Sequence, residues 1–518
     1  MNCVQVNLIQ RRDDLLSTEI RTLWEMDFKD IKIEDTQGTS KENRYALSLL
    51  DNSVTLKDGH YELAAPWKSG APSLPNNKPL ATRRLSHLQQ RLKKDDELRK
   101  KYVETMEGYV QKGYAKRASI REAPETGKVW YLPHHPVLSD KKPGKVRVVF
   151  DCAARYGGTS LNEQLLHGPD LSCNLVGVLC RFRQNQVAIV SDIECMFYQV
   201  NVRDQDRDCL RFLWWPSGDF TKSPEEYCMH VHLFGATSSP CCASYCLKKT
   251  AEDNAENFSP EATRAVERAF FVDDFLHSVS TKTEAIRLIG EVRDLLLLGG
   301  FKLTKWLSTY KHVLAVVPDK DRATAAVNID LDGQKTEKVL GVTWNFGSDA
   351  FEFAVDLKHK PITLRGLLSV ISSLFDPLGF VAPVVARILL QRLCKQQCGW
   401  DEEISQDYAS VWQEWLRDLP TLAAASIKQC FIPPDFQQPI RRELHYFADA
   451  STSGYAVVVT YLRVADDDGK VHCAFVSDGK NSPGSPEGSH SASVGTASGN
   501  PCSSTRSVLT KRAGHRTG

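Results

Sequence analysis

The chain has 518 residues, a length that allows about three or four domains. Its formal net charge is +1, and its hydrophobic and charged fractions of 42% and 25% are those of an ordinary globular protein. These values exclude a protein that binds nucleic acid through a global excess of positive charge. Any nucleic-acid surface therefore has to be local.

We predict neither a membrane span nor a secretory signal. No apolar run approaches the roughly 18 residues that a transmembrane helix needs, and the segment "MNCVQVNLIQRRDD" has no continuous apolar core. The 15 cysteines have no regular spacing and are expected to be reduced thiols. The cysteines of 241–246, like Cys394 and Cys398, lack a matching second pair, so a zinc site is not expected.

The first predicted element follows a mixed, loop-rich region that ends near residue 80. Residues 86–112 are predicted to form one amphipathic helix, because apolar side chains recur there at helical spacing. We interpret its lysines and arginines as a solvated face, with contact to a nucleic-acid backbone as the alternative.

The middle of the chain, from about residue 128 to 350, combines strand and helix patterns. Strands are predicted at 145–150, 186–194, 209–215 and 227–234, and helices at 240–255 and 281–300. Helical patterns dominate from 361 to about 420, and strand periodicity returns at 445–463. After Asp478 the sequence is rich in Ser, Gly and Pro without apolar periodicity, which predicts disorder.

The stretch "RAFFVDDFLHSVS" sets two adjacent carboxylates, Asp273 and Asp274, between two short apolar runs. Adjacent like charges repel each other and resist burial, so a fold that keeps them there is expected to use them. A plain hairpin turn is the alternative, since aspartate is a good turn former.

Asp192 ends a predicted buried strand, and a hairpin beside that strand would bring all three carboxylates together. Such a cluster is tolerable only if cations neutralise it, and its hard oxygen ligands favour Mg²⁺ or Mn²⁺. Two such ions would activate an attacking hydroxyl and stabilise a leaving phosphate, which is the chemistry of polymerases.

Several motifs, in order and spacing, resemble those of reverse transcriptases. "FVDD" is similar to their Y-x-D-D box, "VSDIECMFYQV" to their first palm motif, and "LFGATSSP" to their template-and-nucleotide loop; "GGFKLTKW" and "LGVTW" fit the segments after the palm. The segments "YLPHHPVLSDKKPGKVRVVFDCAARYGGTSLNEQLLHGPDL" and "LSVISSLFDPLGFVAPV" resemble the polymerase polyprotein of BEL/Pao-type LTR retrotransposons. The resemblance covers about residues 1–478.

The resemblance implies an α+β fold of the right-hand polymerase type, with fingers, palm and thumb. A connection region and a partial RNase H-like sheet would follow. The implied regions are an N-terminal linker (1–85), fingers and palm (86–350), a helical thumb and connection region (351–440), a truncated RNase H-like start (441–478) and a disordered tail (479–518).

The resemblance also assigns the metal-binding and catalytic residues. Asp192, Asp273 and Asp274 would hold the two metal ions, with Asp192 and Asp273 as the principal ligands. Ile193 could contribute only its backbone carbonyl, because its side chain is apolar. Phe271 stands where the family box has tyrosine and retains a stacking surface without the hydroxyl.

The implied nucleotide-binding residues come from three motifs. Arg147 matches the arginine that contacts the triphosphate, with Lys145 assisting; an exposed strand edge is the alternative. Phe197 would exclude a ribose 2′-hydroxyl, with a core aromatic as the alternative. Phe234 and Gly235 would shape the nucleotide pocket, Phe234 standing where retroviral enzymes carry glutamine.

Lys305 and Trp306 resemble the turn that supports the primer, with a packed aromatic as an equal alternative for Trp306. The family is also catalogued under an aspartic peptidase name. We find no D-[ST]-G motif in the chain, since "EDTQG" has an intervening Gln37. Peptidase activity is therefore expected as a label only.

The segment "YFADAST" resembles the first strand of an RNase H domain, with Asp449 as its first metal carboxylate. The family continues with a segment like "PLK-VTIPRLEL-A", which carries the second carboxylate, whereas this chain reads "SPEGSHSASVGTASGNP". Permitted codons for this stretch, shifted by one base, restore the family segment nearly intact. We hypothesise that residues from about 479 onward are a frameshifted translation.

The function implied by the resemblance is RNA-directed DNA polymerisation, with an RNA or DNA template-primer and dNTPs as partners and Mg²⁺ or Mn²⁺ as cofactor. A membrane is not among the expected partners. The alternatives are a catalytically decayed remnant that folds and binds nucleic acid, and the aspartic peptidase of the family label. The expected location is the cytoplasm, in virus-like particles if the element is active, or the nucleus.

Overall fold

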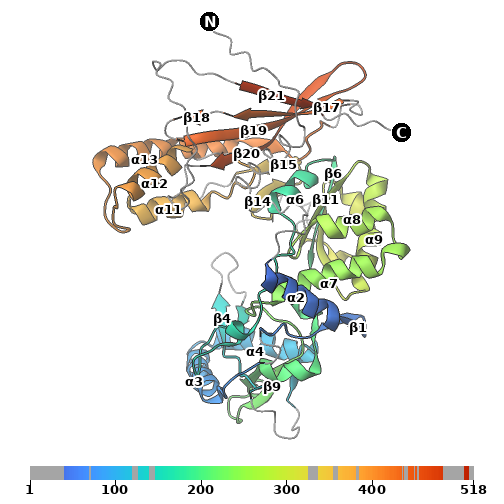
Figure 1. Ribbon diagram of the computed structural model, residues 1–518, viewed down its shortest axis with the longest axis vertical. Helices are drawn as coiled ribbons and strands as arrows, with labels where there is room; N and C mark the ends of the chain where they lie inside the picture. Colours follow the sequence, from blue (N-terminus) through green and yellow to red (C-terminus); the bar gives the residue numbers. More distant parts are fainter. Residues whose placement is uncertain are drawn as a thin grey trace.

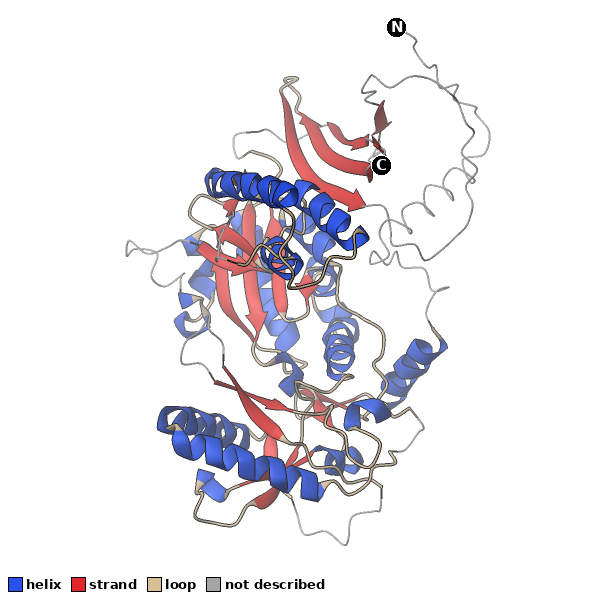
Figure 2. Cartoon of the chain, turned by 90° about the vertical axis from the view of Figure 1, so that its left-hand side faces the viewer, coloured by secondary structure: helices blue, strands red, loops and turns tan. Residues whose placement is uncertain are grey.

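A computed structural model describes residues 40–68, 72–118, 127–138, 146–324, 336–353, 360–380, 384–433, 436, 441–448, 450–451, 454–481 and 507–512. The described elements form an elongated, open arrangement (Figure 1). The C-terminal strands lie at one end, and the two helices of residues 78–94 and 96–111 lie near the other. The side view in Figure 2 separates the same two ends. Within the described ranges, no helix is long and apolar enough to span a membrane.

The chain enters through helix α2 (Lys41–Ser53) and the hairpin of β1 (Thr55–Lys57) and β2 (His60–Leu63). Strand β2 then pairs in parallel with β7 (Asn201–Val202). This pairing fixes the N-terminal segment against residues that follow the candidate metal ligand Asp192 in the sequence.

The predicted single helix at 86–112 is wrong, because the chain forms two helices, α3 (Lys78–Lys94) and α4 (Asp96–Gln111). Asp95 separates them in an extended conformation, and its Oδ1 accepts a hydrogen bond of 2.9 Å from the N–H of Leu98. An aspartate in this position caps a new helix by satisfying one of its free N–H groups. The predicted apolar stripe itself is buried, at Leu88, Leu92, Leu98, Tyr102 and Met106.

Two small antiparallel sheets pack on these helices. One has the order β3 (Ala115–Arg117), β9 (Glu225–Met229), β8 (Arg211–Trp214), and the other pairs β4 (His134–Leu138) with β5 (Val146–Phe150). The short helix α5 (Leu161–Gln164) follows β5 in the sequence. Together these elements enclose one core of buried aromatic and aliphatic side chains.

The central sheet has four antiparallel strands in the order β10 (Phe270–Phe271), β11 (Asp274–Val279), β6 (Val187–Ile193), β12 (Leu303–Ser308). Helices surround it and share its core: α6 (Leu175–Phe182), α7 (Ser239–Asp253), α8 (Pro260–Arg268) and α9 (Lys282–Leu297). The predicted strand at 186–194 and the predicted helices at 240–255 and 281–300 are confirmed.

Past the central sheet, a second four-stranded sheet has the order β13 (Thr336–Val339), β14 (Val342–Asn345), β15 (Ala350–Glu352), β16 (Ser426–Lys428). The predicted helical region is present as α11 (Leu364–Ser373), α12 (Val384–Lys395) and α13 (Gln406–Asp418). These three helices bury a small core of their own, which includes Leu367, Leu393 and Trp412.

The C-terminal sheet has the order β18 (Ala450–Ser451), β19 (Gly454–Ala465), β17 (Arg441–Ala448), β21 (Ser507–Arg512), and β20 (Val471–Asn481) pairs with β19. The disorder predicted for 479–518 is contradicted at 479–481 and 507–512. The physical reason is the edge of β17, which the segment "SVLTKR" covers by antiparallel pairing. The remaining tail residues lie outside the described part of the chain.

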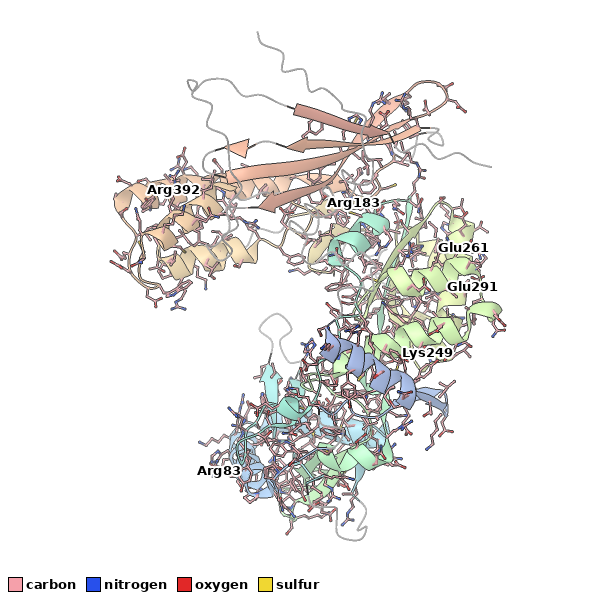
Figure 3. All side chains as sticks on the ribbon, in the orientation of Figure 1. Arg83, Arg183, Lys249, Glu261, Glu291 and Arg392 are labelled. Atoms are coloured by element: carbon pink, nitrogen blue, oxygen red, sulfur yellow. The ribbon has the colours of Figure 1, made fainter. Side chains whose placement is uncertain are left out.

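Arg183, directly after α6, attaches this C-terminal part to the central sheet (Figure 3). Its guanidinium donates hydrogen bonds to the carbonyl oxygens of Gln429 at 3.1 Å and Phe475 at 2.9 Å, and it lies 4.3 Å from the ring centroid of Phe431. Burial lowers the pKa of Arg183 to about 10. Among the described residues no carboxylate pairs with this buried charge, so it depends on these carbonyls and rings, and the two parts are held in a defined contact.

Candidate active site

Asp192 and Asp274 lie directly opposite each other on the neighbouring antiparallel strands β6 and β11. Residues paired in this way project their side chains to the same face of a sheet. The two carboxylates, distant in the sequence, therefore share one face at the end of the central sheet. The predicted juxtaposition of Asp192 with the acidic pair is confirmed.

Asp273 lies in the tight turn that joins β10 to β11. Phe271 pairs with Asp274, which leaves Val272 and Asp273 as the two turn residues. Val272 has a φ of +57°, a left-handed conformation that is costly for a β-branched residue. The carbonyl oxygen of Asp273 accepts a hydrogen bond of 2.9 Å from the N–H of Ile193, which fixes the turn to the end of β6. Asp273 therefore lies in a hairpin turn, and this turn adjoins the paired carboxylates of Asp192 and Asp274.

The acidic cluster is electrostatically strained. Burial raises the pKa of Asp274 to about 7, and repulsion from Asp273 and Asp192 adds to the effect. The pKa of Asp273 is also raised, first by burial and then by Asp192, while Lys305 and Arg147 oppose the rise. Shifts of this cause are typical of functional carboxylates that a bound cation would relieve.

Lys305 supplies the nearest positive charge. Its Nζ lies 2.7 Å from Oδ2 of Asp192. The pairing of β12 with β6 is irregular between Thr304 and Leu307, and Lys305 adopts a left-handed φ of +55° inside that irregularity. The irregular backbone is what turns the lysine toward the acidic face.

The donor set fits hard divalent cations, because carboxylate oxygens are the ligands that Mg²⁺ and Mn²⁺ prefer. As the described residues stand, no group of three or more His, Cys, Asp or Glu side chains is drawn together closely enough to hold a metal ion. The Asp192 carboxylate is instead engaged by Lys305. The side chain of Ile193 is buried in the core, so its carbonyl remains its only route to a ligand role.

Of the two basic residues predicted at the nucleotide, only one is described. Arg147 is exposed on β5 and acts on Asp273, whose pKa it lowers across the gap between the two sheets. The contact of Arg147 with a triphosphate stays a prediction. Lys145 lies outside the described residues.

Phe197 and Phe234 form an aromatic pair beside the cluster. Their ring centroids lie 4.4 Å apart with an interplanar angle of 45°. Phe197 is 8% exposed and joins the central core, whereas Phe234 is 47% exposed and covers it from the solvent side. The core-aromatic interpretation therefore describes Phe197 in this structure, and its exclusion of a 2′-hydroxyl stays a prediction.

Gly235 has to be a glycine. Its φ is +109°, and a Cβ there would lie 2.4 Å from the carbonyl oxygen of Phe150. Asn162 holds this loop on both sides, because its Nδ2 donates to the carbonyl of Gly235 at 2.9 Å and its Oδ1 accepts from the N–H of Thr237 at 2.9 Å. The sequence reasoning missed Asn162; its only signal is its position within the quoted family segment "TSLNEQLLHG".

Trp306 is fully buried and its ring lies 6.2 Å from that of Phe275, so the packed-aromatic alternative describes it. A direct primer contact by this ring is not available in this conformation. Asp449, the predicted RNase H carboxylate, lies outside the described residues, as does the "EDTQG" segment.

Residues 363–483 match the family described as Pao retrotransposon-like RNaseH-like domain. The match begins before α11, so it takes in helices that the family resemblance assigned to a thumb and connection region (351–440). It also carries an RNase H name and not the expected peptidase label. No curated protein matches the sequence.

Among solved structures, the chain is similar to a foamy viral protease-reverse transcriptase in two complexes. In the complex of the dRH form with ds DNA, the TM-score is 0.46 at 13% identity, over 88% of this chain and 71% of that one. In the complex with RNA/DNA hybrid, the TM-score is 0.46 at 13% identity, over 90% and 52%. A likeness this low carries no argument about activity.

Residues 363–483 are thus the part of the chain that is similar to this family. This match supports kinship of the chain with a Pao/BEL-type retroelement polyprotein.

Proposed function

We propose that this chain is an RNA-directed DNA polymerase. The observation that carries the proposal is the pairing of Asp192 with Asp274 across β6 and β11, with Asp273 in the adjoining turn. In this proposal the central sheet is the palm, the elements between α3 and β9 form the fingers, and α11–α13 with the following strands belong to the thumb, connection and RNase H-like regions.

Asp192, Asp273 and Asp274 would hold two Mg²⁺ or Mn²⁺ ions. When bound, such ions lower the pKa of a primer 3′-hydroxyl and neutralise charge on the phosphates. The protein's own contribution is a set of carboxylates fixed on a rigid sheet and turn, already strained by mutual repulsion. Metal binding would require the release of Lys305 from Asp192 and the closer approach of the three carboxylates.

The reaction joins the primer 3′-oxygen to the α-phosphorus of a dNTP, breaks the bond between the α-phosphorus and its bridging oxygen, and releases pyrophosphate. Arg147 would bind the triphosphate, which its effect on Asp273 supports. Phe197 would exclude the 2′-hydroxyl, and Gly235 would let the loop backbone approach the nucleotide. The ring of Phe234, the residue before Gly235, packs against the ring of Phe197. This contact supports a pocket shared by Phe197 and Gly235.

A second candidate is a catalytically inactive remnant that binds nucleic acid. The loss of strand periodicity after residue 478, inside the region where the family carries its second RNase H carboxylate, favours it. The two candidates differ in turnover and not in binding.

Primer extension separates them. Purified protein is incubated with poly(rA)/oligo(dT), dTTP and Mg²⁺ or Mn²⁺, while binding of the same template-primer is measured by fluorescence anisotropy. Extension supports the polymerase. Binding without extension in either metal supports the inactive remnant.

A further inference from the structure

The ion pair between Lys305 and Asp192 occupies the carboxylate that the proposed function assigns to a metal. Of the lysines and arginines that the structure describes, Lys305 is the one that forms an ion pair with any of the three carboxylates. Its charge also opposes the raised pKa of both Asp273 and Asp274.

The local backbone is built for this contact. Thr304 pairs with Asp192 in regular register, and its Oγ1 donates to the Asp192 carbonyl at 3.4 Å. Regular alternation would send the next side chain to the opposite face of the sheet. The irregular pairing and the left-handed φ of Lys305 reverse that direction, at a backbone cost of about 1 kcal/mol or more.

The contact is also easy to break. The side chain of Lys305 is 66% exposed, whereas that of Asp192 is 24% exposed. A long, exposed lysine can swing into solvent without disturbing the core, because exposed ion pairs contribute little. Asp192 stays in place when the lysine leaves, since it is fixed in β6 between β11 and β12.

We propose that Lys305 is a built-in cation that neutralises Asp192 in the metal-free protein and competes with a divalent ion for its Oδ2. A divalent ion such as Mg²⁺ binds carboxylate oxygens at about 2.0–2.1 Å, so on this oxygen it would lie beside the ammonium group, which is 2.7 Å from the same atom, and the two positive charges would repel each other. Lys305 is in this sense a positioning residue. The inference rests on the proposed metal site.

The test is Mn²⁺ binding, followed by the electron paramagnetic resonance signal of free Mn²⁺, in the full chain without nucleic acid. Lys305→Met keeps the aliphatic stem and removes the charge. We expect it to bind Mn²⁺ about two- to fivefold more tightly than the parent, the range that loss of an exposed ion pair covers. We also expect it to melt at a lower temperature than the parent without metal, with the difference shrinking as Mn²⁺ is added.

Lys302→Met is the matched control. Lys302 is 42% exposed and pairs with Asp321 at 2.8 Å and with Glu194 at 3.6 Å. Its substitution therefore removes the same charge from the same segment without altering a contact of the three aspartates. Its Mn²⁺ affinity is expected to equal that of the parent. If both variants tighten binding equally, the effect is general charge removal and the competition is refuted.

Asp192→Asn distinguishes a failure of the proposed metal site from a failure of the role proposed for Lys305. Suppose that the parent binds Mn²⁺, that Asp192→Asn does not, and that Lys305→Met binds it with the parent's affinity. This outcome supports the metal site and overturns the role of Lys305. An absence of Mn²⁺ binding in the parent and in Lys305→Met alike overturns both.

Discussion

Asp274 on β11 faces Asp192 on β6 as a directly paired residue, so two carboxylates share one face of a four-stranded sheet. A protein has no structural reason to place them there, because their repulsion and burial are unfavourable. The strained turn at Val272 and the reversed side chain of Lys305 are further costs at the same place. Such a concentration of unfavourable features is expected at a functional site.

The first prediction concerns pH. The pKa of Asp274 is raised in the folded state to about 7, above its unfolded value, so the folded protein binds the proton more tightly. The stability of the metal-free protein should therefore fall as pH rises from about 4 to 8. Asp274→Asn should remove this dependence and be more stable than the parent at pH 8, by an amount on the order of 1–4 kcal/mol.

The measurement is urea denaturation at pH 5 and pH 8, with EDTA present. Replacement of EDTA by Mn²⁺ should restore the parent's stability at pH 8, since the ion replaces the proton. Parallel pH profiles of the parent and Asp274→Asn would show that this carboxylate is not strained.

The second prediction concerns the nucleotide loop. Gly235→Ala should destabilise the protein by about 1–3 kcal/mol and raise the KM for dNTP, because the new Cβ meets the Phe150 carbonyl at 2.4 Å. Gly108→Ala, in α4 with no atom within 4 Å of the new Cβ, is the control and should be neutral or stabilising. Thermal melts and dNTP titrations measure both; equal effects of the two substitutions would refute the account of this loop.

The third prediction concerns sugar selection. Phe197→Ala should increase incorporation of rNTPs relative to dNTPs by roughly tenfold or more, since the ring that excludes the 2′-hydroxyl is removed. Phe234→Ala should have a smaller effect in the same direction, because it only uncovers Phe197. Single-nucleotide incorporation gives both ratios. Unchanged discrimination in Phe197→Ala would return this ring to the core alone.

The fourth prediction is that the chain cleaves no RNA in an RNA–DNA hybrid, even where it extends primers. Asp449 is the one RNase H carboxylate that the sequence resemblance identifies, and a lone carboxylate does not hold two metal ions. The assay follows labelled hybrid with the parent and Asp449→Asn. Cleavage by the parent that disappears in Asp449→Asn would contradict the prediction.

The candidate site was predictable because its signals are local. Asp192 ends an apolar strand, and Asp273 with Asp274 interrupts two short ones, so strand and turn patterns place all three. The sheet order and the opposition of Asp192 to Asp274 then follow from antiparallel pairing. Phe234 and Gly235 likewise sit where the loop motif indicated.

The other features depend on tertiary contacts that a linear pattern does not contain. Asn162 meets Gly235 only after folding, and Arg183 meets Phe431 from a distant segment. The burial of Trp306 depends on an irregular pairing in β12. The composition of the tail gave no reason to expect β21, whose partner β17 lies far away in the sequence.

The most direct test of the polymerase assignment is primer extension by the parent and by Asp273→Asn on poly(rA)/oligo(dT) with Mg²⁺ or Mn²⁺. The account predicts extension by the parent and a loss of at least about 100-fold in the variant, with the fold retained by circular dichroism. Extension by Asp273→Asn at the parental rate would contradict the assignment of this carboxylate cluster.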